Sequence, residues 1–523
     1  MATSKYSVNS RSASLTLMKT TIVLMLLGAS SLSAAAIPEP LKLDAGLLTG
    51  TAGKTATVQV YKGIPYAAPP VGELRWRAPQ PVAAWQGVRK ADEFSPICMQ
   101  AAAPGSTVNM SEDCLYLNVF TAAQRAGEKR PVMVWLHPGG YNSGSGSQPG
   151  YDGESFARKG VVIVTINYRL GALGFFSHPQ LTQEGQGRWA ANQAFLDQTA
   201  ALQWVQRNIA AFGGDPRKVT VFGNSAGGTS ISNLVASPTT RGLFVRAISQ
   251  SGAWLGLSIA PVRTLADAEA LGVKAAETLQ AQSLADLRAK PAADILRAAR
   301  GAGPVIDGVF FPTDPAQIYA RGQQNKVAII AGSNKDEGTF FLQPTTAAAW
   351  QERVQQRFAA RAADYLKLYP AASDDEATRS QYDAFRDELG WVDRNYARLQ
   401  TQAGAKAWLY YFTHEPPGPP LWPARASGAT HGGEAQFIWN NLIADRPWRD
   451  SDRAVAAYMQ AYWINFATTG DPNGSGLPRW SPYDAKRNLR AMQLGDIAEA
   501  APLPDAAKLA FYQAWYDATA LAH

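Results

Sequence analysis

The chain has few of the residues that hold metals in proteins. Its 523 residues include only two cysteines, Cys98 and Cys114, and five histidines. Two cysteines cannot complete a structural zinc site, and the histidines are spread from His137 to His523 without close ligand spacing. The sequence therefore predicts no metal site.

Long apolar runs and clusters of one charge are also missing. The formal net charge is +7, but the basic residues are scattered along the chain. They therefore form no basic cluster of the kind that binds nucleic acid. The apolar run over residues 20–28 is too short to cross a membrane, and no later run is long enough either. We expect no nucleic-acid partner and no stable membrane insertion.

The first 36 residues have the pattern of a secretory signal peptide. Three basic residues precede the apolar run, and Ala34-Ala35-Ala36 forms a small-residue exit site. We expect cleavage there and export, so that the mature protein is secreted or periplasmic with a net charge of +7 − 3 = +4. In an exported protein, an isolated pair such as Cys98 and Cys114 is expected to form a disulfide.

Residues 37–523 contain no low-complexity linker and no internal repeat, which favours one large domain. Apolar runs such as residues 131–136, 161–168, 219–222 and 327–330 end in polar, glycine-rich loops, and helical patterns lie between them. This alternation predicts an α/β fold with a mostly parallel sheet covered by helices on both faces, with helical insertions at 255–305 and 345–400. Reactive groups of such sheets gather beyond the carboxyl ends of the strands.

A candidate nucleophile stands at one of these strand ends. Gly223-Asn224-Ser225-Ala226-Gly227 follows a β-branched run and precedes a small-residue segment that is expected to be helical. A serine on such a strand-to-helix turn is lifted clear of the sheet, and the glycines on either side avoid clashes within the turn.

A serine hydroxyl needs a base, and the base needs an orienting acid. His431, in a loop without apolar periodicity, is the favoured base; His137 is expected to brace its glycine loop, and His414 stays open as an alternative. Asp336 and Glu337 both lie between serine and histidine in the chain, and the chemistry alone does not choose between them.

Backbone N–H groups must also face the oxygen on which negative charge develops. Gly139 and Gly140 follow a buried strand in a glycine loop, whereas Pro138 has no N–H to donate. Ala226, directly after the serine, can supply a third N–H from the helix end.

With these residues assembled, the chain resembles the type-B carboxylesterases of the α/β-hydrolase superfamily, from about Gly46 to the C-terminus. The resemblance rests on several motifs in order along the chain: residues 61–70 (YKGIPYAAPP), 111–119 (SEDCLYLNV), 212–216 (FGGDP), the serine turn, and 334–338 (NKDEG).

The resemblance implies an α/β-hydrolase domain over residues 37–523 and selects among the open alternatives. It implies Glu337 as the triad acid and His431 as the base beside Ser225, and Ser251 as a nearby supporting serine. It also implies oxyanion donors at Gly139, Gly140 and Ala226 and a Cys98–Cys114 disulfide. Asn224 departs from the family, which usually has glutamate there, and a changed substrate preference or pH profile is expected.

The sequence thus predicts a serine esterase that needs no cofactor and acts on small-molecule carboxylic esters through an acyl-enzyme. An amidase or peptidase on the same fold, and a catalytically silent cholinesterase-like binding protein, are the alternatives. The sequence does not select among simple acyl esters, polyesters and mycotoxins such as fumonisins as the substrate, and it does not indicate the oligomeric state. Three aromatic residues that follow strands either line the substrate pocket or belong to the core: Trp254, Phe340 and Phe341.

Overall fold

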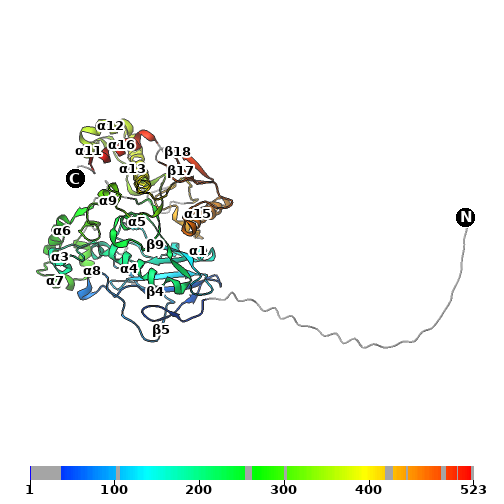
Figure 1. Cartoon of the computed structure of the whole chain (residues 1–523). Helices are drawn as coiled ribbons and strands as arrows, with labels where there is room; N and C mark the ends of the chain where they lie inside the picture. Colours follow the sequence, from blue (N-terminus) through cyan, green and yellow to red (C-terminus); the bar gives the residue numbers. More distant parts are fainter. Residues whose placement is uncertain are drawn as a thin grey trace, which may run out of the picture. The chain divides into compact units, whose positions relative to one another are not determined.

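The computed structural model describes residues 1, 37–101, 107–253, 262–299, 303–418, 428–442, 444, 446–484, 490–502 and 505–519. The expected signal peptide, over residues 1–36, lies almost entirely outside the described residues. The domain is built around one large sheet, whose strands β9 and β4 are labelled in Figure 1.

This sheet is parallel in its centre and antiparallel at both edges. Neighbouring strands from β17 to β10 pair in parallel, whereas β18, β8, β4 and β3 join antiparallel. In order across the sheet the strands are β18 (Ala498–Pro502), β17 (Arg490–Leu494), β16 (Ala407–Phe412), β15 (Ala328–Asn334), β12 (Arg246–Gln250), β11 (Gly214–Asn224), β9 (Arg130–Leu136), β10 (Val162–Ile166), β8 (Tyr116–Thr121), β4 (Gln59–Pro65) and β3 (Thr51–Ala52).

Both faces of the central strands are buried, and alternate residues face different hydrophobic clusters. In β9, Val132 and Val134 pack in the cluster that includes residues of α4 (Gln193–Asn208), α5 (Ala226–Ala236) and α13 (Asp374–Gln402). Met133 and Trp135 pack in the cluster with residues of α1 (Glu154–Arg158), α14 (Ala435–Trp439) and α15 (Asp450–Thr469). The period of two along a strand therefore explains why these runs are continuously apolar.

The two helical insertions form where the sequence predicts them. The first contains α6 (Leu265–Thr278), α7 (Leu284–Ala289) and α8 (Ala292–Ala298). The second contains α11 (Ala347–Phe358) and α12 (Ala362–Leu368) and continues into α13, which gathers with α16 (Ala506–Thr519) near the C-terminus (Figure 1).

Several strand bounds differ from the sequence prediction; β15, for example, continues to Asn334 rather than ending at Ile330. β11 begins at Gly214 rather than near Lys218, because Gly214 pairs with Arg130 and the register then shifts before Val219. β10 ends at Ile166 rather than Tyr168. The Tyr168 hydroxyl donates 2.7 Å to the His137 carbonyl, so the end of this run leaves the ladder to brace a neighbouring loop.

Candidate active site

Ser225 lies on a sharp turn between β11 and α5. Its φ of 55° and ψ of −122° are unusual for a residue with a side chain, and its backbone N–H donates 2.8 Å to the Gln250 carbonyl of β12. Strain of this kind is typical of a nucleophile held clear of a sheet. The serine is partly exposed whereas its neighbours on both sides are buried.

The glycines flanking the serine are required by close backbone contacts. A Cβ on Gly227 would lie 2.0 Å from the Leu136 carbonyl oxygen, and one on Gly223 would lie 2.6 Å from the same atom. Leu136 ends β9 directly before His137. The absence of side chains at both glycines therefore lets the serine turn sit against the start of the glycine loop.

That loop has backbone conformations that favour glycine. Gly139 and Gly140 have φ values of +122° and +61°, and a Cβ on Gly139 would lie 2.0 Å from the Ser143 carbonyl oxygen. The Gly139 carbonyl accepts from the N–H groups of Asn142 and Ser143 at 3.0 and 3.1 Å. These bonds hold the loop without using the N–H of either glycine, while Ala226 begins α5 with an N–H that has no partner within the helix.

His137 braces this loop, as the sequence predicts. Its Nδ1 donates 2.8 Å to the Pro138 carbonyl, and its ring stacks on Tyr168 with centroids 4.3 Å apart. Burial lowers the pKa of His137 to about 4, so the ring is neutral at physiological pH.

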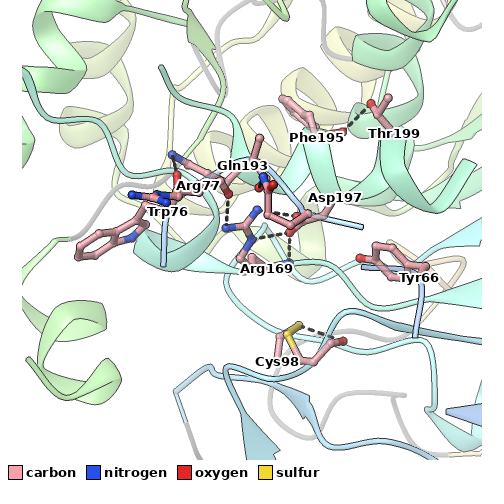
Figure 2. Close-up of polar contacts among 12 residues, drawn as sticks. Tyr66, Trp76, Arg77, Cys98, Arg169, Gln193, Phe195, Asp197 and Thr199 are labelled. Carbon is pink, nitrogen blue, oxygen red and sulfur yellow. Dashed lines mark hydrogen bonds and ion pairs between the residues drawn. A yellow bond between two sulfur atoms is a disulfide. The ribbon is translucent and has the colours of Figure 1, made fainter. Parts of the chain in front are cut away.

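The region beside the glycine loop is anchored by a buried ion pair. Arg169, after β10, donates from Nε and Nη2 to the two carboxylate oxygens of Asp197 in α4 at 2.7 and 2.6 Å, and from Nη1 to the Arg77 carbonyl (Figure 2). Two residues on, the Gly171 N–H donates 2.6 Å to the Tyr141 carbonyl, directly after Gly140. The ion pair thereby fixes a segment that contacts the glycine loop.

The predicted disulfide forms between Cys98 and Cys114. Gln100, two residues after Cys98, exchanges hydrogen bonds with the Gly144 backbone at 2.9 and 3.0 Å. The disulfide-bonded segment therefore also supports the end of the glycine loop.

His431 and Glu337 form a buried pair. Glu337 begins α10 (Glu337–Phe341) after β15, has no exposed surface, and accepts from His431 Nδ1 at 2.5 Å. Its other oxygen accepts from the Ser251 hydroxyl at 2.6 Å and from the Asn334 N–H at 2.8 Å. The carboxylate places the proton of the imidazole on Nδ1. Among the described residues, His431 Nε2 has no hydrogen-bond partner, which leaves its lone pair available.

Asp336 has a different role from its neighbour. Its Oδ2 accepts from the Ala429 N–H at 2.8 Å, and its own N–H donates 2.9 Å to the Ala429 carbonyl. Burial raises the pKa of this carboxyl. Asp336 therefore fastens the loop that carries His431 without contacting the imidazole in any described hydrogen bond.

His414 is held on both ring nitrogens. Nδ1 lies 2.7 Å from an oxygen of Asp496 and Nε2 lies 2.6 Å from an oxygen of Asp452. A base must have a free nitrogen to accept a proton, and His414 has none. The geometry thus favours His431 over His414.

Two of the aromatic residues considered from the sequence lie against the histidine. The Phe341 and Phe340 ring centroids are 4.5 and 5.4 Å from that of His431. Phe341 keeps 39% of its surface exposed, so it can offer an apolar wall to a substrate. Trp254, considered with them, lies outside the described residues.

Three buried residues of this site, Glu434, Gln250 and Asn334, are not predicted from the sequence. Glu434 accepts hydrogen bonds from Asn224, Gln250 and Asn334. Asn334 lies in the 334–338 motif, three residues before the acid, and Glu434 lies three residues after the base. Their contact with each other depends on the fold and leaves no signal in the spacing.

The described residues contain no group of three or more His, Cys, Asp or Glu side chains that could hold a metal ion. No helix in the described part of the chain is both long and apolar enough to cross a membrane.

Comparisons with known proteins agree with this architecture. The model of the carboxylesterase family matches residues 39–512. The fumonisin B1 esterase of Sphingopyxis macrogoltabida is 35% identical over 497 residues, covering 89% of each chain. The para-nitrobenzyl esterase of Bacillus subtilis (strain 168) is 35% identical over 458 residues, covering 82% of this chain and 89% of the relative.

The liver carboxylesterase 1 of Oryctolagus cuniculus is 33% identical over 527 residues, covering 89% of this chain and 91% of the relative. A solved structure of a PNB esterase superposes with a TM-score of 0.77 at 33% identity, covering 90% of this chain and 99% of the other. The chain therefore belongs to the carboxylesterase family and is a carboxylic ester hydrolase with the α/β-hydrolase fold.

Proposed function

We propose that the chain is an exported serine esterase whose triad is Ser225, His431 and Glu337. The observation that carries this assignment is the hydrogen bond from His431 Nδ1 to the buried Glu337, with Nε2 left unpartnered among the described residues. An imidazole held in this tautomer can take a proton from a serine hydroxyl.

In the first half of the reaction, Ser225 Oγ attacks the ester carbonyl while His431 Nε2 accepts its proton. Glu337 stabilises the imidazolium that results. The N–H groups of Gly139, Gly140 and Ala226 stabilise the oxyanion of the tetrahedral intermediate. The intermediate then collapses, and the alcohol leaves with the proton from His431.

In the second half, His431 removes a proton from water, and the resulting hydroxide attacks the acyl-enzyme carbonyl. A second tetrahedral intermediate collapses to release the carboxylic acid, and Ser225 regains its proton. Each step uses only side chains and backbone N–H groups of this chain, so the mechanism requires no cofactor.

The substrate we propose is a small ester with an apolar group that can pack on Phe340 and Phe341. The similarity to a fumonisin B1 esterase makes that compound a substrate to test beside p-nitrophenyl esters. The signal-like pattern of the first 36 residues supports the proposal of export, and the Cys98–Cys114 disulfide agrees with an oxidising compartment.

The test is hydrolysis of p-nitrophenyl butyrate, the matched p-nitroanilide and fumonisin B1 by the wild type and by Ser225→Ala. We expect ester hydrolysis that disappears in the variant. A preference for the anilide would support an amidase instead. No turnover of any substrate by folded wild-type protein would favour a silent binding protein.

A further inference from the structure

Glu434 is a buried carboxylate that the proposed mechanism does not use. It has no exposed surface and lies three residues after His431. Its Oε1 accepts from Asn224 Nδ2 at 2.9 Å and from Gln250 Nε2 at 3.1 Å, and its Oε2 accepts from Asn334 Nδ2 at 2.6 Å. The hydrogen bonds described for this carboxylate thus come from neutral amides.

Each amide belongs to the last residue of a different strand. Asn224 ends β11 directly before Ser225, Gln250 ends β12 directly before Ser251, and Asn334 ends β15 three residues before Glu337. Glu434 therefore joins the segment that carries the base to the strand ends that carry the nucleophile and the acid.

The orientation of two of these amides is fixed by their other neighbours. Asn334 Nδ2 also donates 2.7 Å to the Thr430 carbonyl, and Asn224 Nδ2 lies 3.4 Å from the Gln250 carbonyl. Carbonyl oxygens only accept, so both amides must present N–H groups toward Glu434. Asn224 is also close to the histidine loop, since a Cβ on Gly432 would lie 3.2 Å from its Oδ1.

A carboxylate suits this position because both of its oxygens can accept at once. An amide at residue 434 would turn its NH₂ group toward either Asn334 or the pair formed by Asn224 and Gln250, where a donor already points. Two buried donors facing each other leave both unsatisfied, which is destabilising by about 1–3 kcal/mol per group.

The electrostatic surroundings of Glu434 include both members of the His431–Glu337 pair. Glu337 is a second nearby carboxylate, whereas the charged form of His431 favours an ionised Glu434. The carboxyl of Asp393 and the phenols of Tyr151 and Tyr410 also sense its charge. Burial raises the pKa of Glu434, and the amide donors from Asn334 and Gln250 oppose that rise.

We propose that Asn224 and Glu434 form a clamp of fixed hydrogen-bond polarity that positions the His431 loop against the Ser225 strand end. Asn224 is the donor and Glu434 the acceptor, and both are positioning residues rather than catalytic ones. This inference rests on the proposed function, since the clamp matters only if His431 is the base for Ser225.

The polarity of the clamp can be reversed by exchanging the two functional groups. Asn224→Asp sets two carboxylates against each other, and Glu434→Gln sets two donors against each other. In the double variant, the amide introduced at position 434 can donate from its nitrogen to the carboxylate introduced at position 224, and its oxygen can accept from Asn334. Gln250 can turn its own amide to accept from the same nitrogen, because its Oε1 has no hydrogen-bond partner in the described structure.

The experiment measures kcat and KM for p-nitrophenyl butyrate, together with thermal unfolding, in the wild type, both single variants and the double variant. We expect each single variant to lose about 10- to 100-fold in kcat, as one or two unsatisfied buried groups imply. The double variant should be at least about threefold more active than the weaker single variant but should stay below the wild type, because the carboxylate introduced at position 224 still faces the Gln250 carbonyl. KM should be nearly unchanged throughout, since both side chains are buried.

Two further variants distinguish a specific effect at Asn224 from the general effect of changing a buried asparagine. Asn224→Ala removes one donor without creating a clash, and a smaller loss of kcat than in Asn224→Asp is expected. Asn118→Asp is the matched control, because Asn118 is a buried, hydrogen-bonded asparagine on β8; its kcat should stay near the wild-type value.

The outcomes distinguish this inference from the proposed function. Wild-type protein without esterase activity would refute the proposed function. An active wild type whose single variants keep full kcat, or whose double variant is no more active and no more stable than the weaker single variant, would overturn the clamp. A double variant that does not fold while both single variants do would also overturn it.

Discussion

Replacing Glu337 with glutamine tests the proposed acid through the tautomer of His431. One oxygen of Glu337 accepts from the Ser251 hydroxyl and from the Asn334 backbone N–H, at 2.6 and 2.8 Å. The backbone donor cannot turn away. The glutamine must therefore place its carbonyl oxygen there, which directs its NH₂ group at His431 Nδ1.

An NH₂ group facing Nδ1 forces that nitrogen to accept. The proton of the imidazole then moves to Nε2, which can no longer take a proton from Ser225. The corresponding aspartate-to-asparagine change in a serine protease triad lowers kcat about 10⁴-fold. We expect a loss of about 10³- to 10⁴-fold in kcat for Glu337→Gln, or about 4–5.5 kcal/mol of transition-state stabilisation.

Asp336→Asn is the matched control on the neighbouring residue. An asparagine can still accept from the Ala429 N–H through its carbonyl oxygen, so the histidine loop keeps its anchor. We expect less than about a tenfold loss in kcat, because no catalytic proton is redirected. The assay is steady-state hydrolysis of p-nitrophenyl butyrate by proteins with matched thermal unfolding. The reasoning is refuted if Asp336→Asn loses as much activity as Glu337→Gln, or if Glu337→Gln stays within tenfold of the wild type.

Three other predictions follow from buried polar groups. His414→Gln should keep kcat within about tenfold, because both ring nitrogens already contact carboxylates; a loss of 10²- to 10⁴-fold in steady-state turnover by folded protein would identify it as the base for Ser225. Asp197→Asn leaves the Arg169 guanidinium buried without its anion and should lower the free energy of unfolding in urea by about 3–5 kcal/mol, whereas a cost below 1 kcal/mol would show the pair to be dispensable. Burial raises the pKa of Asp393 well above its ordinary value, so the folded state keeps this proton at a pH where the unfolded chain has lost it. The neutral Asp393 carboxyl therefore contributes its full stabilisation to the folded state below the unfolded pKa of about 4. This contribution is lost as the pH rises toward the folded pKa. Asp393→Asn should therefore unfold at a higher temperature than the wild type at pH 8 but not at pH 4, and an equal shift at both pH values would contradict the raised pKa.

The sequence predicts the architecture well because its signals are local. Continuously apolar runs that end in glycine loops indicate buried parallel strands, and the structure has them in one sheet with helices on both faces. The serine turn is equally local, since its glycines are required by contacts of the adjoining backbone.

The choice between neighbouring acids and between histidines depends on tertiary contacts. Asp336 and Glu337 are chemically alike and adjacent, but only Glu337 begins α10 with its side chain buried against His431. His414 is set apart from His431 by two aspartates that lie 38 and 82 residues away in sequence. No motif spacing encodes such contacts.

The role of Asn224 shows the same limit. The sequence marks it as a departure from the family and predicts the loss of a charge near the histidine. The structure shows a carboxylate that remains beside this position, on Glu434, and an amide at residue 224 that donates to it at 2.9 Å. Relative to the glutamate that the family resemblance implies at this position, the asparagine therefore differs in hydrogen-bond polarity as well as in charge.

The central claim, that Ser225 is the nucleophile activated by His431, is tested most directly by covalent labelling. Wild-type protein, Ser225→Ala and Glu337→Gln are treated with an organophosphate that carries a fluorophosphonate group, and the intact mass and the modified peptide are determined. We predict one adduct per wild-type chain on Ser225, no adduct in Ser225→Ala, and much slower labelling of Glu337→Gln. Stoichiometric labelling at another serine, or equally fast labelling of Glu337→Gln, would contradict the account.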